Sequence, residues 1–245
     1  MSIFSKNGGA GGVGARVRRP RLNLAGLVRE GIFGVNDGLV ATVGLVSGEA
    51  LAHQSYHAIL IAAVSAAGAA VVSMSVGSYL ATISENDFHR REIRRQAAAI
   101  AEEPRREHRH VQKLLADLGV PASAVPPAAA NIVQSRRRWL AFMVREHLGI
   151  HAERQEMPLA NAIAMGLSVI VGSSPPVIPY LLPLPLASAR DLSWALAIAS
   201  ALALGAAKGH VTESSVARSA LAFGVLVSLS SAVGALIGLG LGTLP

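Results

Sequence analysis

An acidic side chain, Asp37, stands within an apolar segment that extends over about residues 31–52. A segment of that length can cross a membrane as a helix. A carboxylate in hydrocarbon is destabilised by several kcal/mol unless it is paired, hydrated or bound to a cation. Gly34 and Gly38 form a Gly-x-x-x-Gly pattern, which lets two membrane helices approach closely. These residues predict a cation or proton site at a helix–helix seam; the alternative is an acid near a helix end that pairs with Arg29.

Two further side chains could contribute to a site around Asp37. Glu30 precedes Asp37 by seven residues, a spacing that puts both on one face of a helix. Glu30 could be the first ligand that a cation meets, or a solvated charge at the membrane boundary. Met74 lies in the second apolar segment, and its thioether is a soft, weak ligand for transition metals. A single methionine in a membrane helix more often serves packing, which is the alternative for Met74.

A polar stretch between the second and third apolar segments carries a second group of candidate ligands. Glu107 and His110 are three residues apart, which places them on one face of a helix. The same Glu-x-x-His spacing occurs in carboxylate-bridged metal bundles, where it is present in pairs. Only one copy is present here. A solvated, charged helix is therefore the alternative to a metal site.

The same stretch also contains Met143, His147 and His151 at intervals of four residues, with Glu146 beside them. A face that combines thioether, imidazole and carboxylate groups suits divalent first-row metals. Gly149, however, can end the helix before His151. In the alternative, Met143 packs in a small core while the histidines face water.

The third apolar segment contains Pro175, Pro176 and Pro179, and proline interrupts the hydrogen bonds of a helix. A helix that is broken at membrane depth often lines a transport cavity, whereas a kink or the end of a span requires no such role. The sequence has no phosphate-binding loop, dinucleotide-binding fingerprint or Ser/His/Asp set. We therefore do not expect an enzyme.

The composition indicates that these side chains are carried by membrane helices. Of the 245 residues, 51% are hydrophobic and 15% are charged, compared with about 25% charged residues in soluble domains. The uncharged apolar stretches indicate transmembrane helices. We expect these at about residues 31–52, 57–83, 158–182, 191–208 and 219–242. The chain has no cysteine, so it contains neither disulfides nor thiolate metal sites.

The expected fold class is an all-α membrane protein with five transmembrane helices and a cytoplasmic three-helix insert between the second and third spans. Residues 1–28 are expected to be a disordered basic tail, 29–83 the first two spans, 84–156 the insert and 157–245 the remaining spans. Within the insert, helices are expected from Glu85 to about Ala101, from Pro104 to near Gly119, and over about 128–148.

The distribution of basic residues predicts the orientation in the membrane. Of the 22 Lys and Arg residues, 6 lie in the N-terminal tail and 13 in the insert. Basic residues are enriched on the cytoplasmic side, so we expect the N-terminus and the insert to be cytoplasmic. No cleavable signal peptide is evident in the first 30 residues. The absence of an evident organellar targeting tail favours a bacterial inner membrane. Because the basic residues flank apolar spans, lipid explains them and no nucleic-acid partner is expected.

Several motifs together resemble the vacuolar iron transporter family, whose members transport divalent iron and manganese. The resemblance covers about residues 30–242. The motifs are G-x-N-D-G-L-V-x-x-x-G-L-V at 34–46, S-M-x-x-G-x-Y at 73–79, E-x-P-x-x-E at 102–107, L-G at 148–149, P-x-x-P-Y at 176–180 and G-x-x-K-G at 205–209. The first motif, and the five spans with an insert after the second, are the most specific.

This resemblance implies a homodimer that exports cytosolic ferrous iron, and often other divalent metals, in exchange for protons. The path would follow the dimer interface between the first and second spans. Asp37 and Met74 match family positions that line this path. Glu107 and Met143 match metal-binding positions in the cytoplasmic helical domain.

The chain departs from the family pattern at several of these positions. Ser78 stands where members usually have glutamate, and Gln96 and Ala99 stand where ligand glutamates are expected. His110 and His147 replace two further glutamates. Exchanging carboxylate for imidazole favours borderline metals such as Co, Ni, Zn or Cu over Mn. With fewer acids in the membrane, proton coupling is also less well supported.

Three functional hypotheses follow from these residues. The first is a divalent metal exporter of the Fe2+/Mn2+ type that works by proton antiport through a dimer interface. The second is a membrane-anchored metal-binding or sensing protein whose insert binds metal without transport. The third retains the transport fold but carries another substrate, such as a proton or an organic cation.

Overall fold

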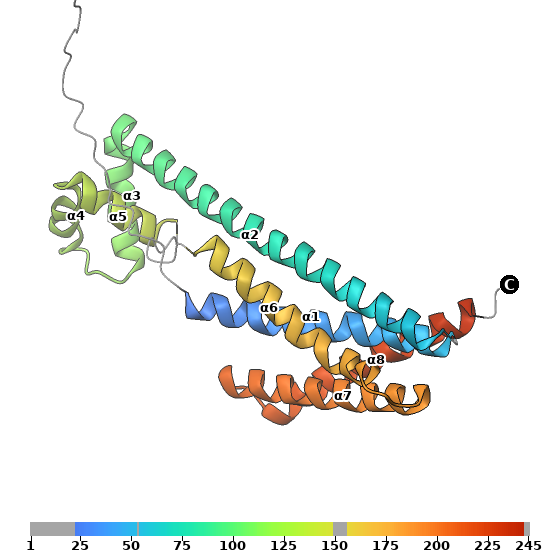
Figure 1. Cartoon of the computed structure of the whole chain (residues 1–245). Coiled ribbons are helices and arrows are strands. Elements are labelled where there is room, and N and C mark those ends of the chain that lie inside the picture. The colour runs from blue at the N-terminus through green and yellow to red at the C-terminus, as the bar shows by residue number, and fades with distance from the viewer. Residues whose placement is uncertain (1–22, 53, 149–155, 243–245) are drawn as a thin grey trace, which may run out of the picture. The chain divides into compact units, whose positions relative to one another are not determined.

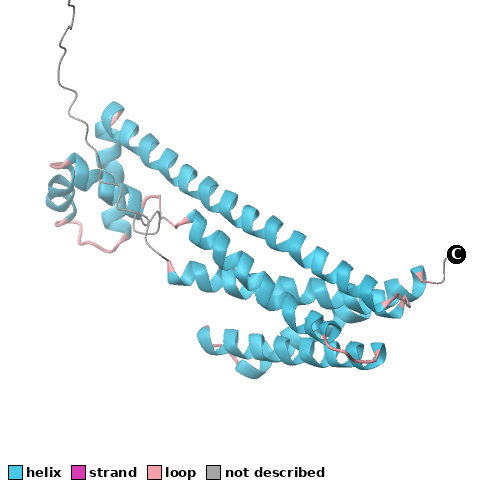
Figure 2. Ribbon diagram, viewed as in Figure 1, coloured by secondary structure: helices cyan, strands magenta, loops and turns pink. Residues whose placement is uncertain are grey.

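The computed structural model describes residues 23–52, 54–148 and 156–242, which form helices and loops and no strand (Figures 1 and 2). Five of the helices are long and apolar enough to cross a membrane. They are α1 (Leu24–Leu51), α2 (Tyr56–Glu102), α6 (Pro158–Val177) with the 3-10 helix η2 (Ile178–Leu181), α7 (Leu186–Val211) and α8 (Val216–Leu241). The predicted all-α class and the order of five spans are confirmed.

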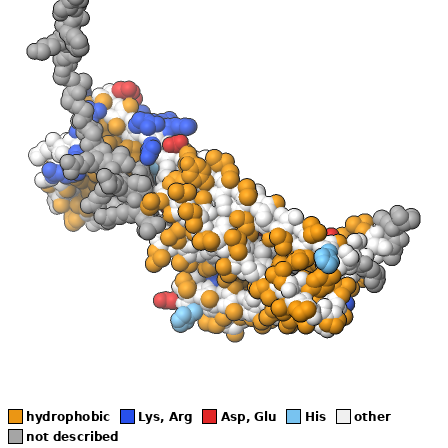
Figure 3. Space-filling view, viewed as in Figure 1, with side chains coloured by type: hydrophobic (Ala, Val, Ile, Leu, Met, Phe, Trp, Pro, Cys, Tyr) orange, Lys and Arg blue, Asp and Glu red, His pale blue; other side chains and the backbone are white. Residues whose placement is uncertain are grey.

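The chain divides into two compact units, which are described separately. One comprises the spanning helices, and the other is the insert, residues 84–155. Figure 3 shows apolar side chains over the visible face of the spanning helices, whereas Lys and Arg side chains gather on the insert. Residues 1–22 of the predicted tail lie outside the described residues, and α1 begins at Leu24 rather than near residue 31.

The described part of the insert contains four helical segments. α2 continues without a break to Glu102, as the sequence predicts, and α3 (Pro104–Asp117) follows with its proline in the first turn, where no amide hydrogen is needed. Gly119 ends this segment with a φ of 83°, a conformation that glycine adopts without strain. Together these helices enclose a small core that includes Ile100, Val111 and Leu115.

Where the sequence predicts one helix over 128–148, the structure has two, α4 (Val125–Val133) and α5 (Arg136–Glu146). The break lies at Ser135, which has an extended backbone and whose hydroxyl accepts a hydrogen bond from the Arg138 amide. Serine is a preferred residue at a helix N-terminus, because its side chain satisfies an amide that the helix leaves unpaired. The local capping preference of Ser135 therefore divides a segment that the sequence predicts to be one helix.

α1 packs against α6 through backbone-to-backbone contact. The Gly-x-x-x-Gly pair faces this helix: a methyl group on Gly34 would lie 2.8 Å from Ser168 Cβ, and one on Gly38 would lie 2.5 Å from the Val169 carbonyl oxygen. The Ser173 hydroxyl donates a hydrogen bond to the Gly38 carbonyl at 3.3 Å. The predicted close approach at Gly34 and Gly38 therefore occurs within the chain, between the first and third spans.

A second set of glycines joins α1 to α8. Gly44 and Gly48 lie opposite Gly234 and Gly238, and a methyl group on Gly48 would lie 2.9 Å from the Gly234 carbonyl oxygen. At such distances no side chain fits between the helices. Between the same helices the Ser230 hydroxyl donates to the Val40 carbonyl at 2.8 Å. α1 is thus fixed on two faces by helices that contact its backbone.

The prolines of α6 lie at the end of its span and do not interrupt it at mid-depth. Pro175 and Pro176 occupy the last turn, after which the chain tightens into η2. The Ser193 hydroxyl donates to the Pro176 carbonyl at 2.8 Å, and the Tyr56 hydroxyl donates to the Leu182 carbonyl at 2.5 Å. Side chains from α7 and α2 therefore satisfy carbonyl groups here. The prolines thus match the alternative given for them from the sequence, namely the end of a span.

The α1–α8 contact predicts a sharp sensitivity to side-chain size. Gly234→Ala would place a methyl group against the Gly44 carbonyl oxygen, which we expect to cost about 1–3 kcal/mol of folding free energy. The measurement is the thermal unfolding midpoint of the protein in detergent. Gly240→Ala, in the same helix, is the matched control, since a methyl group there meets no other described segment within 4 Å. Equal midpoints for the two variants would contradict the packing of α1 on α8.

Candidate metal sites

Asp37 lies at the midpoint of α1, 13 residues after Leu24 and 14 before Leu51. The helical rise puts it about 20 Å from either end, so the carboxylate is deeper in the span than the sequence alone suggests. No hydrogen bond or ion pair joins it to any residue that the structure describes. The carboxylate is therefore a charge at membrane depth without a protein counter-charge in the described part of one chain.

Asp37 occupies the face of α1 that the other helices leave open. Phe33 and Ala41, one turn before and after it, are both exposed, whereas Gly34 and Gly38 face α6. Beside it, Asn36 Oδ1 is buried and has no hydrogen-bond partner among the described residues. Two consecutive residues in the middle of α1 therefore carry side-chain oxygens without a partner among the described residues.

Met74 is partly buried on α2, and helix register gives its depth relative to Asp37. The Ser78 hydroxyl of α2 bonds Glu30 of α1, and Ile59 packs in one cluster with Ala50 of α1. The two helices are therefore antiparallel, and their register puts Met74 within about one turn of Asp37 in depth. No hydrogen bond or ion pair joins the two side chains in the described part of the chain.

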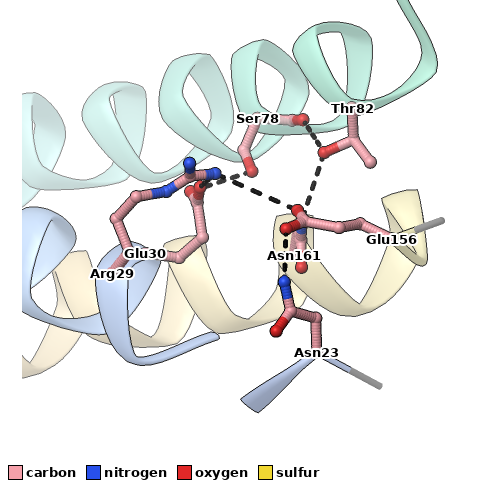
Figure 4. Close-up of polar contacts among 7 residues, drawn as sticks. All are labelled: Asn23, Arg29, Glu30, Ser78, Thr82, Glu156 and Asn161. Atoms are coloured by element: carbon pink, nitrogen blue, oxygen red, sulfur yellow. Dashed lines mark hydrogen bonds and ion pairs between the residues drawn. The ribbon is translucent and has the colours of Figure 1, made fainter. Parts of the chain in front are cut away.

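Glu30 belongs to a polar network that lies at one end of the spanning helices (Figure 4). One carboxylate oxygen of Glu30 accepts a hydrogen bond from the Ser78 hydroxyl at 3.0 Å. The other lies 3.2 Å from Arg29 Nη2, which also lies 3.9 Å from Glu156 Oε2. Glu30 is thus a paired acid within a built cluster, which differs from both the free ligand and the solvated charge considered from the sequence.

The same network reaches α6 and α2 through Asn161. Its amide nitrogen donates to Glu156 Oε2 at 2.6 Å and to Thr82 Oγ1 at 3.2 Å. The Asn23 amide donates to the second oxygen of Glu156 at 2.8 Å. Asn161 is only 2% exposed and Thr82 only 6%. No sequence motif pointed to this cluster, although an asparagine within an apolar span is a signal that could have indicated it.

In the insert, a second carboxylate is buried. Glu107 on α3 is 5% exposed, and Gln96 Nε2 donates to its Oε2 at 2.6 Å. His110 Nδ1 lies 3.4 Å from Glu107 Oε1, and the His110 ring stacks on that of His147 with centroids 5.8 Å apart. The structure therefore brings together Glu107, His110 and His147, and it adds Gln96 as a partner of the carboxylate.

The other predicted ligands of the insert have different surroundings. Met143 is fully buried in the hydrophobic core of the insert. Glu146 pairs with Arg145 at 3.1 Å, and His151 lies outside the described residues. Within the described ranges, no group of three His, Asp or Glu side chains is arranged closely enough to hold a metal ion.

On the exposed side of α3, one arginine is paired with the acid that precedes the helix. Arg106 Nη1 donates to Glu103 Oε2 at 2.9 Å, and this hydrogen bond raises the pKa of Arg106 above its ordinary value. Glu103 is consequently engaged at the surface of the helix. Glu107, one turn further along, is the carboxylate that faces the interior of the insert.

These features define a class: an integral, multi-pass helical membrane protein with an acid at mid-span and a polar helical insert. The sequence model of the VIT family matches residues 28–239. The chain is 32% identical over 209 residues to vacuolar iron transporter 1 of Arabidopsis thaliana, covering 84% of this chain and 82% of that protein. It is 31% identical over 207 residues to vacuolar iron transporter 1 of Eucalyptus grandis, covering 84% and 83%. The chain belongs to the VIT family.

The buried pair in the insert predicts a coupled effect on stability. Gln96→Leu removes the donor while keeping a similar volume, which leaves the Glu107 carboxylate buried and costs about 1–3 kcal/mol. Adding Glu107→Leu should recover part of that loss, because the carboxylate is then no longer buried without its donor, whereas His110 loses its acidic neighbour. The measurement is hydrogen exchange of α3 in the full-length protein. Gln112→Leu, a partly buried glutamine on α3, is the control. Full additivity of the Gln96 and Glu107 changes would contradict the pairing.

Proposed function

We propose that this protein transports a divalent transition metal of the Fe2+/Mn2+ type out of the cytoplasm. The observation that carries the proposal is the Asp37 carboxylate, which lies at the midpoint of α1 without a partner in the described chain. An acid in that position is stabilised when a cation occupies its site. The proposal is further supported by the relatives, which are named vacuolar iron transporters.

The chemistry of the neighbouring groups supports a transition metal as substrate. Asp37 supplies a carboxylate, Asn36 an amide oxygen without a partner among the described residues, and Met74 a thioether at similar depth. Sulfur ligands favour softer metals over Mg2+ or Ca2+, which prefer oxygen ligands alone. We assign Asp37 as the charged ligand and Met74 as the group that disfavours hard cations.

A second copy of the chain would complete this site. α2 is sparsely covered, and its exposed face carries small residues at helical spacing, namely Ser65, Gly68, Ala69, Ser73 and Gly77. Small residues permit close packing of membrane helices. Asp37 also lies on an open face, where a lone chain would present the carboxylate to lipid. We propose that a homodimer covers both faces and encloses the path.

Proton antiport follows from the chemistry of a single acid. A carboxylate at mid-span is compensated either by a metal ion or by a proton, but one group does not bind both at once. Alternate binding of the two ions at Asp37 would exchange one for the other. Ser78, which stands at the position of a family glutamate, bonds Glu30 here, so Asp37 and Glu30 are the acids available to the path.

The insert is proposed as the cytoplasmic metal-binding part of the protein. Glu107, His110 and His147 supply one carboxylate and two imidazoles within a short distance of one another; Met143 and Glu146 extend the proposed set. Imidazole and amide groups in place of carboxylates favour Zn2+, Co2+ or Ni2+ relative to Mn2+. The concentration of basic residues in the tail and insert supports a cytoplasmic location for both. The bacterial inner membrane stays a prediction, which membrane fractionation tests.

Transport is tested with purified protein in liposomes that contain a metal indicator, using a panel of divalent metals with and without a pH gradient. Asp37→Asn should reduce uptake by about tenfold or more, since even the loss of a group that only orients a metal ligand costs about 10–100-fold. Asp191→Asn, at an exposed acid paired with Arg190, is the matched control. Unchanged uptake by Asp37→Asn would refute the proposal.

The same assay separates the alternatives. The buried Glu107 with its histidine neighbours favours metal binding by the insert, which would also serve a membrane-anchored sensor. A sensor predicts that the full-length protein binds metal but produces no flux with any member of the panel. If the protein carries a different substrate, we expect neither metal binding nor metal flux. Flux that is independent of the pH gradient would exclude proton antiport but not metal transport.

The dimer is tested by cross-linking, which is straightforward because the chain has no cysteine. Ser73→Cys and Gly77→Cys, each alone, place one thiol on the exposed face of α2. Mild oxidation in membranes should convert a large share of either variant to a covalent dimer. Leu236→Cys, at an exposed position of α8, should remain monomeric. Equal cross-linking at all three positions, or none on α2, would contradict the proposed interface.

A further inference from the structure

A cavity opens between α1 and α8 at the end of the spanning helices that is remote from Glu30. Its volume is about 500 Å³. Part of its wall is backbone, because it is lined by Gly44 and Gly48 of α1 and by Gly234 of α8. Among the described residues that line it, Glu49 is the only charged one. The cavity thus combines an open volume with a single acid.

The cavity continues the face of α1 that carries Asp37. Gly44 and Gly48 follow Asp37 by seven and eleven residues, spacings that return to nearly the same face of a helix. The helical rise puts Glu49 about 18 Å beyond Asp37 along the axis of α1. A helical side chain leans toward the N-terminus of its helix, so the side chain of Glu49 leans back in the direction of Asp37. An ion that leaves Asp37 along this face therefore reaches the cavity before the end of α1.

The Glu49 side chain is half-buried and has no compensating group. No hydrogen bond or ion pair joins it to any residue that the structure describes. The other acid near this end of the bundle, Asp191 at the start of α7, is paired with Arg190 at 2.8 Å. A carboxylate close to hydrocarbon is stabilised when a cation is bound to it. Glu49 is therefore the acid at this end that is available to a cation.

The backbone adds to the negative potential of the cavity. α1 ends at Leu51 and α8 at Leu241, and a methyl group on Gly242 would lie 2.9 Å from Ala52 Cα. The two C-terminal ends are therefore in contact, and each carries a partial negative charge. Neither helix has a basic residue in its last turn. An acid beside two such ends is destabilised in the absence of a cation, so the electrostatics of the cavity favour cation binding.

We propose that this cavity is an outlet site, in which Glu49 receives the divalent cation after it leaves Asp37. Its role as an outlet rests on the proposed function. The side-chain ligands are oxygens, namely the Glu49 carboxylate and the amide oxygen of Gln54, which also lines the cavity. The volume has room for an ion that keeps part of its water shell. Without a sulfur ligand such as Met74, the outlet does not favour soft metals. A single carboxylate binds the ion weakly, which allows its release.

The outlet is tested by quenching of a dye attached beside the cavity in the full-length protein in detergent. Leu239→Cys, at an exposed position of α8 that does not line the cavity, takes the dye specifically because the chain has no cysteine. Added Co2+ should quench this dye in a saturable way. Adding Glu49→Gln should raise the half-saturating Co2+ concentration about tenfold or more, since even the loss of a group that only orients a metal ligand costs about 10–100-fold.

Three further variants separate binding at Glu49 from other causes. Glu49→Asp keeps the charge and should retain most of the quenching, whereas a general loss of folding would affect both changes at residue 49 alike. Asp191→Asn, at the paired acid of the same end, should have no effect. Asp37→Asn, which should abolish transport, should still show the quenching. An unchanged half-saturating concentration with Glu49→Gln, or an equal increase with Asp191→Asn, would overturn the outlet site.

The quenching does not require transport, so the outlet site and the proposed function can fail separately. In the liposome assay, Glu49→Gln should lower the maximal rate of uptake, because the ion lacks its next ligand after Asp37. Quenching that depends on Glu49, without metal flux by the wild type, would refute the proposed function and retain a cation site. Metal flux without any quenching that depends on Glu49 would refute the outlet site alone.

Discussion

The other features of this bundle are best understood from the high free energy of a carboxylate in hydrocarbon. Asp37 lies at the midpoint of α1 with no counter-charge among the described residues of its chain, and such a group persists only where something compensates it. In the proposed function, a passing metal ion or a proton neutralises this charge, and a second copy of the chain covers the open face of α1 and the small residues on α2.

The sequence predicts those features of the fold that the thickness of the membrane determines. Uncharged stretches of sufficient length give five spans, and the continuity of α2 beyond Ile83 follows from the lack of any helix-breaking residue before Pro104. A pattern such as Gly34-x-x-x-Gly38 also predicts a close contact. It cannot predict which helix makes that contact, because the complementary surface at Ser168 and Val169 lies more than 130 residues away.

The polar clusters were harder to predict for the same reason. Glu30 is paired with Ser78 and Arg29, and the partners of Asn161 come from α2 and from Glu156. Glu30 and Asn161 each stand out in their own segments, but their partners do not, and the network exists only once three helices meet. In the insert, by contrast, the i, i+3 spacing of Glu107 and His110 is local, and the structure retains it. Ser135 shows the converse case, since a local cap divided a helix that hydrophobic periodicity suggests is continuous.

The bundle combines helices held in two physically different ways. α1 is fixed against α6 and α8 by glycine contacts in which backbone meets backbone, so it cannot slide without steric overlap. α2 meets α1 in an apolar cluster around Ile59, packs Ser75 and Val71 on Gly166 of α6, and bonds Glu30 and Asn161 through Ser78 and Thr82. In the proposed path, Asp37 is therefore carried by a helix locked through its backbone, and Met74 by one that is held through side chains. Since a shared site loses affinity when one ligand moves away, a shift of α2 would weaken metal binding while the carboxylate stays in place, ready to take a proton.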